Sequence, residues 1–238
     1  MNILALDTTS KYLSLAIAKN DNIIAAFHRV MDQRQCEQLL PQIDKLLKKA
    51  KVKLKDIDCI AFSKGPGSLT ALRIGAATVK GFALGANPIF SRKDGAGIKI
   101  AGVPTLDALA HNIKEGGKLI VPIIDARRGN VYASAYSFKK GKLRRILKYS
   151  VAPVADLLKS IKGDAVFLGD GLAAYRKTIE DNFKYNAGFA PEKQWYPSAV
   201  TIAHLGYELA KNKKFEETDK FVPMYLYPKD VQVRDLKK

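Results

Sequence analysis

The same order of predicted elements occurs twice along this chain of 238 residues. Each occurrence opens on an apolar strand that ends in an aspartate, ILALD at residues 3–7 and LIVPIID at residues 119–125. In both halves further alternating strands follow, and then helical and strand patterns alternate. Strands that alternate with helices are typical of α/β folds. The duplication therefore predicts two α/β lobes, which we place at residues 1–114 and 115–238.

Hydrophobic periodicity places the individual elements. In the first half it predicts strands at 3–7, 13–19, 22–30, 58–63 and 98–103, and helices at 35–49, 70–85 and 105–114. In the second half it predicts strands at 119–125, 131–138, 143–151 and 165–168, and helices at 154–161, 173–179 and 198–213. The segment 221–227 closes the pattern.

A glycine-rich turn, Gly65-Pro66-Gly67, joins the fourth strand to the helix at 70–85. Glycine tolerates positive φ and proline fixes its own φ, so this turn is tight, and Ser68 or Thr70 can cap the helix. Free N–H groups at such a helix start form an anion-binding geometry. The alternative is a plain, well-capped connection. The segment fits neither the P-loop pattern nor the dinucleotide-binding pattern of glycines.

The chain is strongly basic, with 40 lysine and arginine residues against 23 acidic residues and a net charge of +17. A positive field of this size favours nucleic acid or acidic partners. The basic residues are spread over several runs, however, at 45–55, 139–148 and 237–238, and no series of aromatic residues interleaves with them. We interpret most of this charge as a solvated surface and expect only weak, salt-sensitive contact with tRNA.

Several classes of protein are disfavoured by what the sequence lacks. No apolar run reaches the roughly 18 to 20 residues of a membrane helix, and the first strand begins at once without a signal-peptide pattern. Cys36 and Cys59 lie far apart, which favours free thiols in a reducing cytoplasm. We therefore expect a cytoplasmic protein with no membrane partner.

The three histidines, His28, His111 and His204, argue against a metal centre. None lies four residues from another, and no H-E-x-x-H motif occurs. His111 precedes Glu115 by four residues, but a helical pair of this kind is usually solvated. We predict no bound metal, no cofactor and no metalloprotease activity.

Five blocks of sequence resemble the bacterial TsaB (YeaZ) family, which takes part in making threonylcarbamoyladenosine in tRNA. They are LDTT at 6–9, LLP at 39–41, GPGSLTALRIG at 65–75, VPTLDALA at 103–110 and DARRGNVY at 125–132. The rest of the chain matches only through GDG at 169–171 and PMYL at 223–226. The chain departs from the family at Gln35, where many members have histidine, and at Ser91–Lys99, which resembles an insertion.

This resemblance implies a duplicated actin-like, ribonuclease H-like fold, related to the catalytic subunit TsaD and to the sugar kinases and Hsp70. Each lobe would hold a mixed five-stranded sheet with flanking helices. In that superfamily the first hairpin of each lobe binds nucleotide phosphates. The residues carried over to such a site are Asp7, Thr8, Thr9, Asp125, Gly169, Asp170 and Gly171.

Arg127 and Arg128 follow Asp125, where nucleotide binders of the superfamily have glycine and small hydroxyl residues. Two long side chains there would crowd a phosphate, or would pair with Asp125 and Asp7. We therefore interpret the nucleotide site as degenerate. A weak retained site for ATP or ADP is the alternative.

Two helices are candidates for a partner surface. The helix at 70–85 places Ala71, Gly75, Thr78 and Phe82 on one face, and the helix at 35–49 adds a stripe of Leu39, Ile43 and Leu47 that we expect to be exposed. Glycine inside a helix indicates close approach, either by this chain's own sheet or by another chain. Members of the family are understood to use these helices for self-association and for binding TsaD. Gly75→Leu is then expected to abolish both complexes in a folded monomer.

The resemblance implies a non-catalytic scaffold that forms a homodimer, binds TsaD and the TsaE ATPase, and supports transfer of a threonylcarbamoyl group to adenosine 37 of tRNA. Two alternatives stay open. One is an ATP-dependent small-molecule kinase or ATPase of the same superfamily, and the other is an independent RNA-binding module.

Overall fold

The computed structural model describes residues 1–31, 35–85, 97–114 and 116–227. By its contacts the chain divides into two units, Met1–Ala108 with Pro197–Pro223, and Leu109–Tyr196 with the described part of Met224–Lys238. The boundary predicted after residue 114 lies a few residues too late, and the last helix belongs to the first unit rather than the second. Most of the proposed insertion at Ser91–Lys99 falls outside the described residues.

The first unit is built on a five-stranded sheet with the order β3-β2-β1-β4-β5. Its strands are β1 (Asn2–Asp7), β2 (Tyr12–Lys19), β3 (Asn22–Val30), β4 (Cys59–Ser63) and β5 (Lys99–Val103). The first three strands form an antiparallel meander, and β4 and β5 run parallel to β1. Strand β1 is therefore central and buried on both faces.

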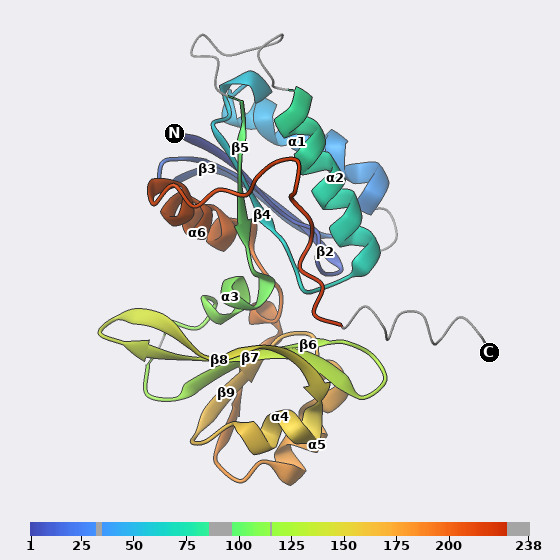
Figure 1. Ribbon diagram of the computed structural model, residues 1–238, viewed down its shortest axis with the longest axis vertical. Coiled ribbons are helices and arrows are strands. Elements are labelled where there is room, and N and C mark those ends of the chain that lie inside the picture. Colours follow the sequence, from blue (N-terminus) through green and yellow to red (C-terminus); the bar gives the residue numbers. More distant parts are fainter. Residues whose placement is uncertain (32–34, 86–96, 115, 228–238) are drawn as a thin grey trace, which may run out of the picture. The chain divides into compact units, whose positions relative to one another are not determined.

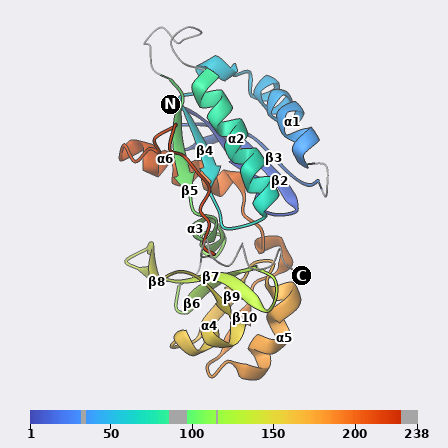
Figure 2. The ribbon, with the colours of Figure 1, turned by 45° about the vertical axis from the view of Figure 1, so that its right-hand side comes forward.

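Helices cover both faces of this first sheet (Figure 2). Helices α1 (Gln35–Ala50) and α2 (Leu69–Gly85) pack on one face, toward which Leu4 and Leu6 of β1 project. Helix α6 (Ala199–Lys211) packs on the other face, which receives Ile3 and Ala5. A short 3-10 turn, η2 (Leu54–Asp56), links α1 to β4.

The face under α6 is lined mostly by alanine, which lets the helix lie very close to the sheet. A Cβ atom added at Gly206 would overlap the Cβ of Ala61 on β4. Sequence periodicity identified α6 as a helix but not the sheet that it covers. Its small residues match the small residues of the first sheet, and this explains its place in the first unit.

Helix α3 (Thr105–Ala110) is shorter than predicted. The chain leaves the helix at His111 and Asn112, where the side-chain amide of Asn112 donates to the carbonyl oxygens of Gln194 and Tyr196, both at 3.0 Å. A tertiary contact therefore ends the helix, and the local pattern does not contain this signal.

The second unit repeats the connectivity of the first, with the sheet order β10-β9-β6-β7-β8 (Figures 1 and 2). Its strands are β6 (Leu119–Asp125), β7 (Asn130–Lys139), β8 (Lys142–Pro153), β9 (Ala165–Leu168) and β10 (Ala187–Phe189). Again a meander of three strands is followed by two parallel strands. The predicted fold class, a duplicated α/β fold with two mixed five-stranded sheets, is confirmed.

Helices α4 (Val154–Ser160) and α5 (Leu172–Asn182) cover one face of the second sheet and bury a core of aliphatic and aromatic side chains around Phe167. A 3-10 turn, η4 (Glu192–Gln194), follows β10. In the residues that the structure describes, every helix is too short or too polar to cross a membrane.

Two helical glycines give a matched test of this packing. A Cβ at Gly81 on α2 would meet no atom within 4 Å, whereas one at Gly206 would overlap Ala61. Gly81→Ala should therefore raise the free energy of unfolding by about 0.5–1 kcal/mol through helix propensity. Gly206→Ala should lower it by about 1–3 kcal/mol through overpacking. Urea unfolding of the two variants measures both values, and equal stabilisation would show that α6 does not lie this close to the sheet.

Candidate functional site

Buried polar side chains gather at the carboxyl ends of three neighbouring strands in the first unit. Asp7 ends β1, Ser63 ends β4, and Thr105 follows β5, and all three are fully buried. The parallel register of β1, β4 and β5 places these ends together. Ligands of α/β proteins bind at this edge of the sheet, so the cluster is the first candidate site.

The carboxylate of Asp7 is held by hydrogen bonds from its own turn. The backbone N–H of Thr9 donates to Oδ1 at 3.1 Å, and the Thr9 hydroxyl donates to Oδ2 at 2.9 Å. Burial raises the pKa of Asp7 to about 6, although hydrogen bonds from Ser63 and Thr9 oppose the shift. Ser63 also lies 2.9 Å, Oγ to Oγ1, from Thr105. A buried acid with a raised pKa is a common property of functional sites.

The glycine-rich turn closes directly over this loop. The N–H of Ser68 donates to the Thr9 carbonyl oxygen at 2.9 Å, and a Cβ at Gly67 would lie 2.6 Å from the Cβ of Thr9. The Thr8 hydroxyl donates to the Ala71 carbonyl oxygen at 2.9 Å. The hydroxyls that we expected to contact phosphate are therefore used within the chain. Of the two interpretations of this turn, these contacts favour the close-fitting connection.

The second unit presents Asp125 at the equivalent position, the end of β6. Its Oδ1 accepts hydrogen bonds from the Arg127 N–H at 2.8 Å and from the Tyr175 hydroxyl at 3.2 Å. The Arg127 guanidinium lies 3.5 Å from Oδ2, with its side chain 87% exposed. The predicted pairing of an arginine with Asp125 is confirmed, but an exposed pair of this kind contributes little stability. Thr9 and Ser63 hold the carboxylate of Asp7, and the pairing of an arginine with Asp7 stays a prediction.

The segment Gly169-Asp170-Gly171 joins β9 to α5 and packs on β6. Gly169 has a φ of 108°, and a Cβ there would overlap the carbonyl oxygen of Ile123. Asp170 accepts a hydrogen bond from the Asp125 N–H at 3.1 Å, and burial raises its pKa. Close packing accounts for both glycines, and a nucleotide-binding role for this segment stays a prediction.

Histidine and cysteine side chains do not form a metal-binding cluster in the described part of the chain. There, no three His, Cys, Asp or Glu side chains come close enough together to hold a metal ion. His204 pairs with Asp21, and the ring of His28 stacks on Tyr12 with centroids 4.5 Å apart. Burial raises the pKa of the Cys59 thiol to about 12. Glu115 and the side chains of Gln35 and Cys36 lie outside the described residues.

The structure corrects the predicted partner surface. Leu39, Ile43 and Leu47 are buried in the core beneath α1, so their predicted exposure is wrong. Gly75 is buried too, and a Cβ there would lie 2.6 Å from both the Phe62 ring and the Thr8 hydroxyl. This chain's own sheet therefore explains Gly75, and Gly75→Leu would disturb the fold of the monomer. Ala71, Thr78 and Phe82 are half-buried on the sides of α2.

A different face of α2 is open. We call it the outer face of α2, and it consists of the exposed residues Leu69, Arg73, Ala77, Gly81 and Leu84. Most of these side chains are small or apolar. Leu40 on the neighbouring helix α1 is 55% exposed. The outer face follows the same helical spacing as the buried one, displaced around the axis, so the sequence pattern alone did not separate them.

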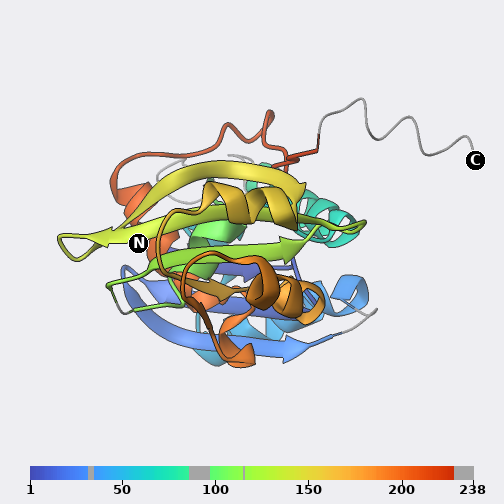
Figure 3. The same ribbon diagram turned by 90° about the horizontal axis from the view of Figure 1, so that it is seen from below.

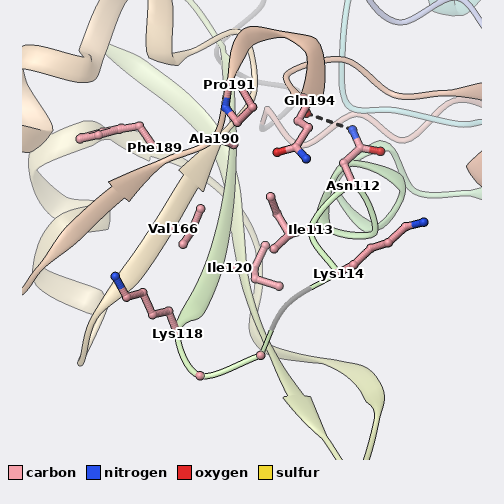
Figure 4. Close-up of a pocket in the computed structure, with 12 residues that line it drawn as sticks. Asn112, Ile113, Lys114, Lys118, Ile120, Val166, Phe189, Ala190, Pro191 and Gln194 are labelled. Atoms are coloured by element: carbon pink, nitrogen blue, oxygen red, sulfur yellow. Dashed lines mark hydrogen bonds between the residues drawn. The ribbon is translucent and has the colours of Figure 1, made fainter.

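The second unit also contains a pocket of about 690 Å³ beside the start of β6 (Figure 4). Ile113, Ile120 and Val166 converge on its centre, while Lys114 and Lys118 extend outward. The full lining is Asn112, Ile113, Lys114, Gly116, Gly117, Lys118, Ile120, Val166, Phe189, Ala190, Pro191 and Gln194. No predicted site residue lines it. The lining comes from three separate segments without a shared motif, so sequence reasoning had no signal for it.

Comparisons with known proteins agree with this fold. A family model described as TsaD, tRNA N6-adenosine threonylcarbamoyltransferase, matches residues 29–233. The tRNA threonylcarbamoyladenosine biosynthesis protein TsaB of Bacillus subtilis (strain 168) is 31% identical over 229 residues, covering 95% of this chain and 94% of the relative. The Escherichia coli (strain K12) protein of the same name is 30% identical over 183 residues, 74% of each chain. A solved structure of YeaZ from Pseudomonas aeruginosa shares the fold, with a TM-score of 0.75 and 24% identity over 94% of this chain and 99% of that chain.

The raised pKa of Asp7 predicts an unusual pH dependence of stability. An acid whose pKa is higher in the folded state than its ordinary value of 3.8 makes the free energy of unfolding fall as the pH rises from about 4 to about 6. Asp7→Asn removes this ionisation. We expect the variant to be more stable than the parent at pH 8, by up to about 3 kcal/mol, and similar to it near pH 4.

Urea unfolding at the two pH values measures this difference. Asp164→Asn is the control of opposite sign, because hydrogen bonds from Asn186 lower the pKa of Asp164. Loss of that carboxylate should cost stability at pH 8 and still cost most of it near pH 4, because the folded-state pKa of Asp164 lies below its ordinary value of 3.8. An Asp7→Asn variant that is less stable than the parent at pH 8 would contradict the buried, protonation-prone carboxyl.

Proposed function

The chain belongs to the bacterial TsaB (YeaZ) family, and on this basis we propose that it serves the biosynthesis of threonylcarbamoyladenosine in tRNA as a non-catalytic scaffold subunit. Its TsaB relatives are named for that biosynthesis. The proposed partners are TsaD, which would perform the transfer to adenosine 37, and the ATPase TsaE. In this proposal tRNA meets the chain weakly or through the complex, and the complex works in the cytoplasm.

One observation supports the non-catalytic part of the proposal most directly. The loop Asp7-Thr8-Thr9, which would bind phosphate in an active superfamily member, is buried. Its two hydroxyls donate to Ala71 and Asp7, and the glycine-rich turn packs against it. A nucleotide there would have to displace the chain's own contacts.

The match to a TsaD model raises the question whether this chain is itself the transferase. The family resemblance implies that TsaD binds its metal through an H-x-x-x-H pair. The three histidines here, His28, His111 and His204, lack that spacing. This difference favours a partner of the transferase over the transferase.

We assign the proposed contact with TsaD, and the homodimer, to the outer face of α2 together with Leu40. Small residues at Ala77 and Gly81 let a second helix approach closely, and interaxial distances of packed helices are about 8–10 Å. Leu69 and Leu84 offer apolar area at the two ends of this face. The same face would serve both partners, so homodimer and TsaD complex would compete.

Gly81→Leu tests this surface. A Cβ at Gly81 meets open space, and leucine is the better helix former, so the monomer should fold and gain stability. The bulky side chain should block helix approach and abolish both the homodimer and the complex with TsaD. Light scattering measures the first and titration calorimetry with purified TsaD the second.

Ala174→Leu provides the matched control, because Ala174 is an exposed small residue on a helix of the second unit. It should leave both complexes unchanged. If Gly81→Leu folds and still binds TsaD with the affinity of the parent, the outer face of α2 is not the interface.

The alternative function, an ATP-dependent kinase or ATPase, gives the opposite result in a direct assay. Because the Asp7 loop is closed and Arg127 pairs with Asp125, we expect no measurable ATP hydrolysis by the isolated chain. Steady turnover in the presence of Mg²⁺ that disappears on Asp7→Ala would establish the enzyme and overturn the scaffold. Calorimetry with ATP and Mg²⁺ separately measures whether a weak nucleotide site is retained.

A further inference from the structure

The hairpin formed by β7 and β8 lies in a long stretch without negative charge. Between Asp125 and Asp156 the sequence contains no aspartate or glutamate, and it contains eight basic residues, Arg127, Arg128, Lys139, Lys140, Lys142, Arg144, Arg145 and Lys148. These residues carry about half of the net charge of +17 within thirty residues. The positive charge is therefore gathered in a few runs, of which this stretch contains the most basic residues.

The duplicated fold supplies an internal comparison. The β2–β3 hairpin of the first unit has the same place in its sheet, with β3 at the edge as β8 is in the second. Between Tyr12 and Val30 that hairpin has two basic residues, Lys19 and Arg29, and one acidic residue, Asp21. The architecture therefore does not require a cationic hairpin. Lysines do protect edge strands from aggregation, but β3 occupies an edge without such a cluster.

The cationic side chains of the β7–β8 hairpin are exposed, and two of them lie opposite one another. Lys139 pairs with Lys142 across the strands, and like charges in this position destabilise a sheet. Within the part of the chain that the structure describes, no ion pair involves Lys139, Lys140, Lys142, Arg144 or Lys148. Among the described residues the repulsion is therefore not relieved, and a polyanion would relieve it.

The geometry of the hairpin suits an extended polyanion. Its tip, Lys140-Gly141, projects past the neighbouring strands of the second unit (Figure 3). Lys142 and Arg144 are two residues apart on β8, so their side chains lie on the same side of the strand, about 7 Å apart. Arg145 pairs with Tyr136 on the other side, and its guanidinium lies 4.0 Å from the Tyr149 ring centroid. Cations thus line both faces of a narrow, projecting ribbon.

From this arrangement we propose that the β7–β8 hairpin is a docking surface for the phosphate backbone of folded RNA. The identification of this RNA as tRNA rests on the proposed function. Phosphate contacts position a nucleic acid without reading its sequence, which matches a scaffold that guides tRNA to a separate catalytic subunit. An anionic membrane is the less suitable occupant, because Ile146 is the only large apolar side chain that the described hairpin exposes strongly.

The test replaces three of these cations in the full chain by glutamine, Lys142→Gln with Arg144→Gln and Lys148→Gln. Arg145 is kept because it packs on Tyr149. The matched control removes the same charge from other exposed positions of the second unit, Lys162→Gln with Lys177→Gln and Lys184→Gln. Circular dichroism checks that both variants fold. If the triple hairpin variant does not fold, Arg144→Gln alone is used in its place.

Binding of unmodified tRNA is measured by fluorescence anisotropy from 50 to 200 mM KCl. Three lost phosphate contacts should weaken binding at low salt by about tenfold and reduce the slope of log K against log salt by about 2. The control should keep its slope and lose less than about twofold. Equal losses in the two variants, or no loss in the hairpin variant, would overturn the proposal, as would loss of binding to phosphatidylglycerol vesicles with tRNA binding intact.

A separate titration with TsaD distinguishes this proposal from the proposed function. The hairpin variant should bind TsaD as the parent does, since its substitutions lie outside the outer face of α2. If the parent chain does not bind TsaD but the hairpin variant still binds RNA more weakly than the parent, the scaffold role is wrong and the RNA-binding surface stands. If the parent binds TsaD and the hairpin variant binds RNA as tightly as the parent, the scaffold role stands and the RNA-binding surface is wrong.

Discussion

The closure of the glycine-rich turn and α2 over the Asp7-Thr8-Thr9 loop determines much else in the first unit. Gly67 lets the turn lie against Thr9, and Gly75 lets α2 lie against Phe62 and Thr8. These contacts fix α2 on the sheet, bury the carboxylate of Asp7, and use the hydroxyls that a nucleotide would need. They also decide which side of α2 faces outward, and so which residues are available to a partner.

The two units show how one topology supports two kinds of polar chemistry. Asp7 and Asp125 end equivalent strands, but the first is buried with a raised pKa and the second is partly exposed beside Arg127. The hairpins that follow differ in the same way, since one is nearly neutral and the other is cationic. Backbone hydrogen bonds and apolar packing give the two units the same fold, and neither depends strongly on which side chains are exposed.

Periodicity and turn chemistry predicted most of the strands and helices, because those signals are local. The exceptions each involve a contact with a distant residue. Strand β10 has only three residues and depends on pairing with β9, and α3 ends early because Asn112 binds carbonyls near residue 195. The spacing of Leu39, Ile43 and Leu47 showed that α1 is amphipathic. In the structure these three side chains pack in the core against the sheet, and Leu40 is exposed. The pocket beside β6 joins separate segments and left no motif to find.

The place of α6 has a consequence for how a cell makes this protein. During synthesis the strands of the first sheet leave the ribosome early, whereas Ala199–Lys211 emerges only after the whole second sheet has been translated. Until then the alanine-lined face around Ala61 has no cover, and a nascent chain with an open sheet face is prone to aggregate or to attract chaperones. The second unit, whose strands and helices lie together in Leu109–Tyr196, can complete its fold first. The second unit can therefore be complete before the first, although most of the first is synthesised earlier.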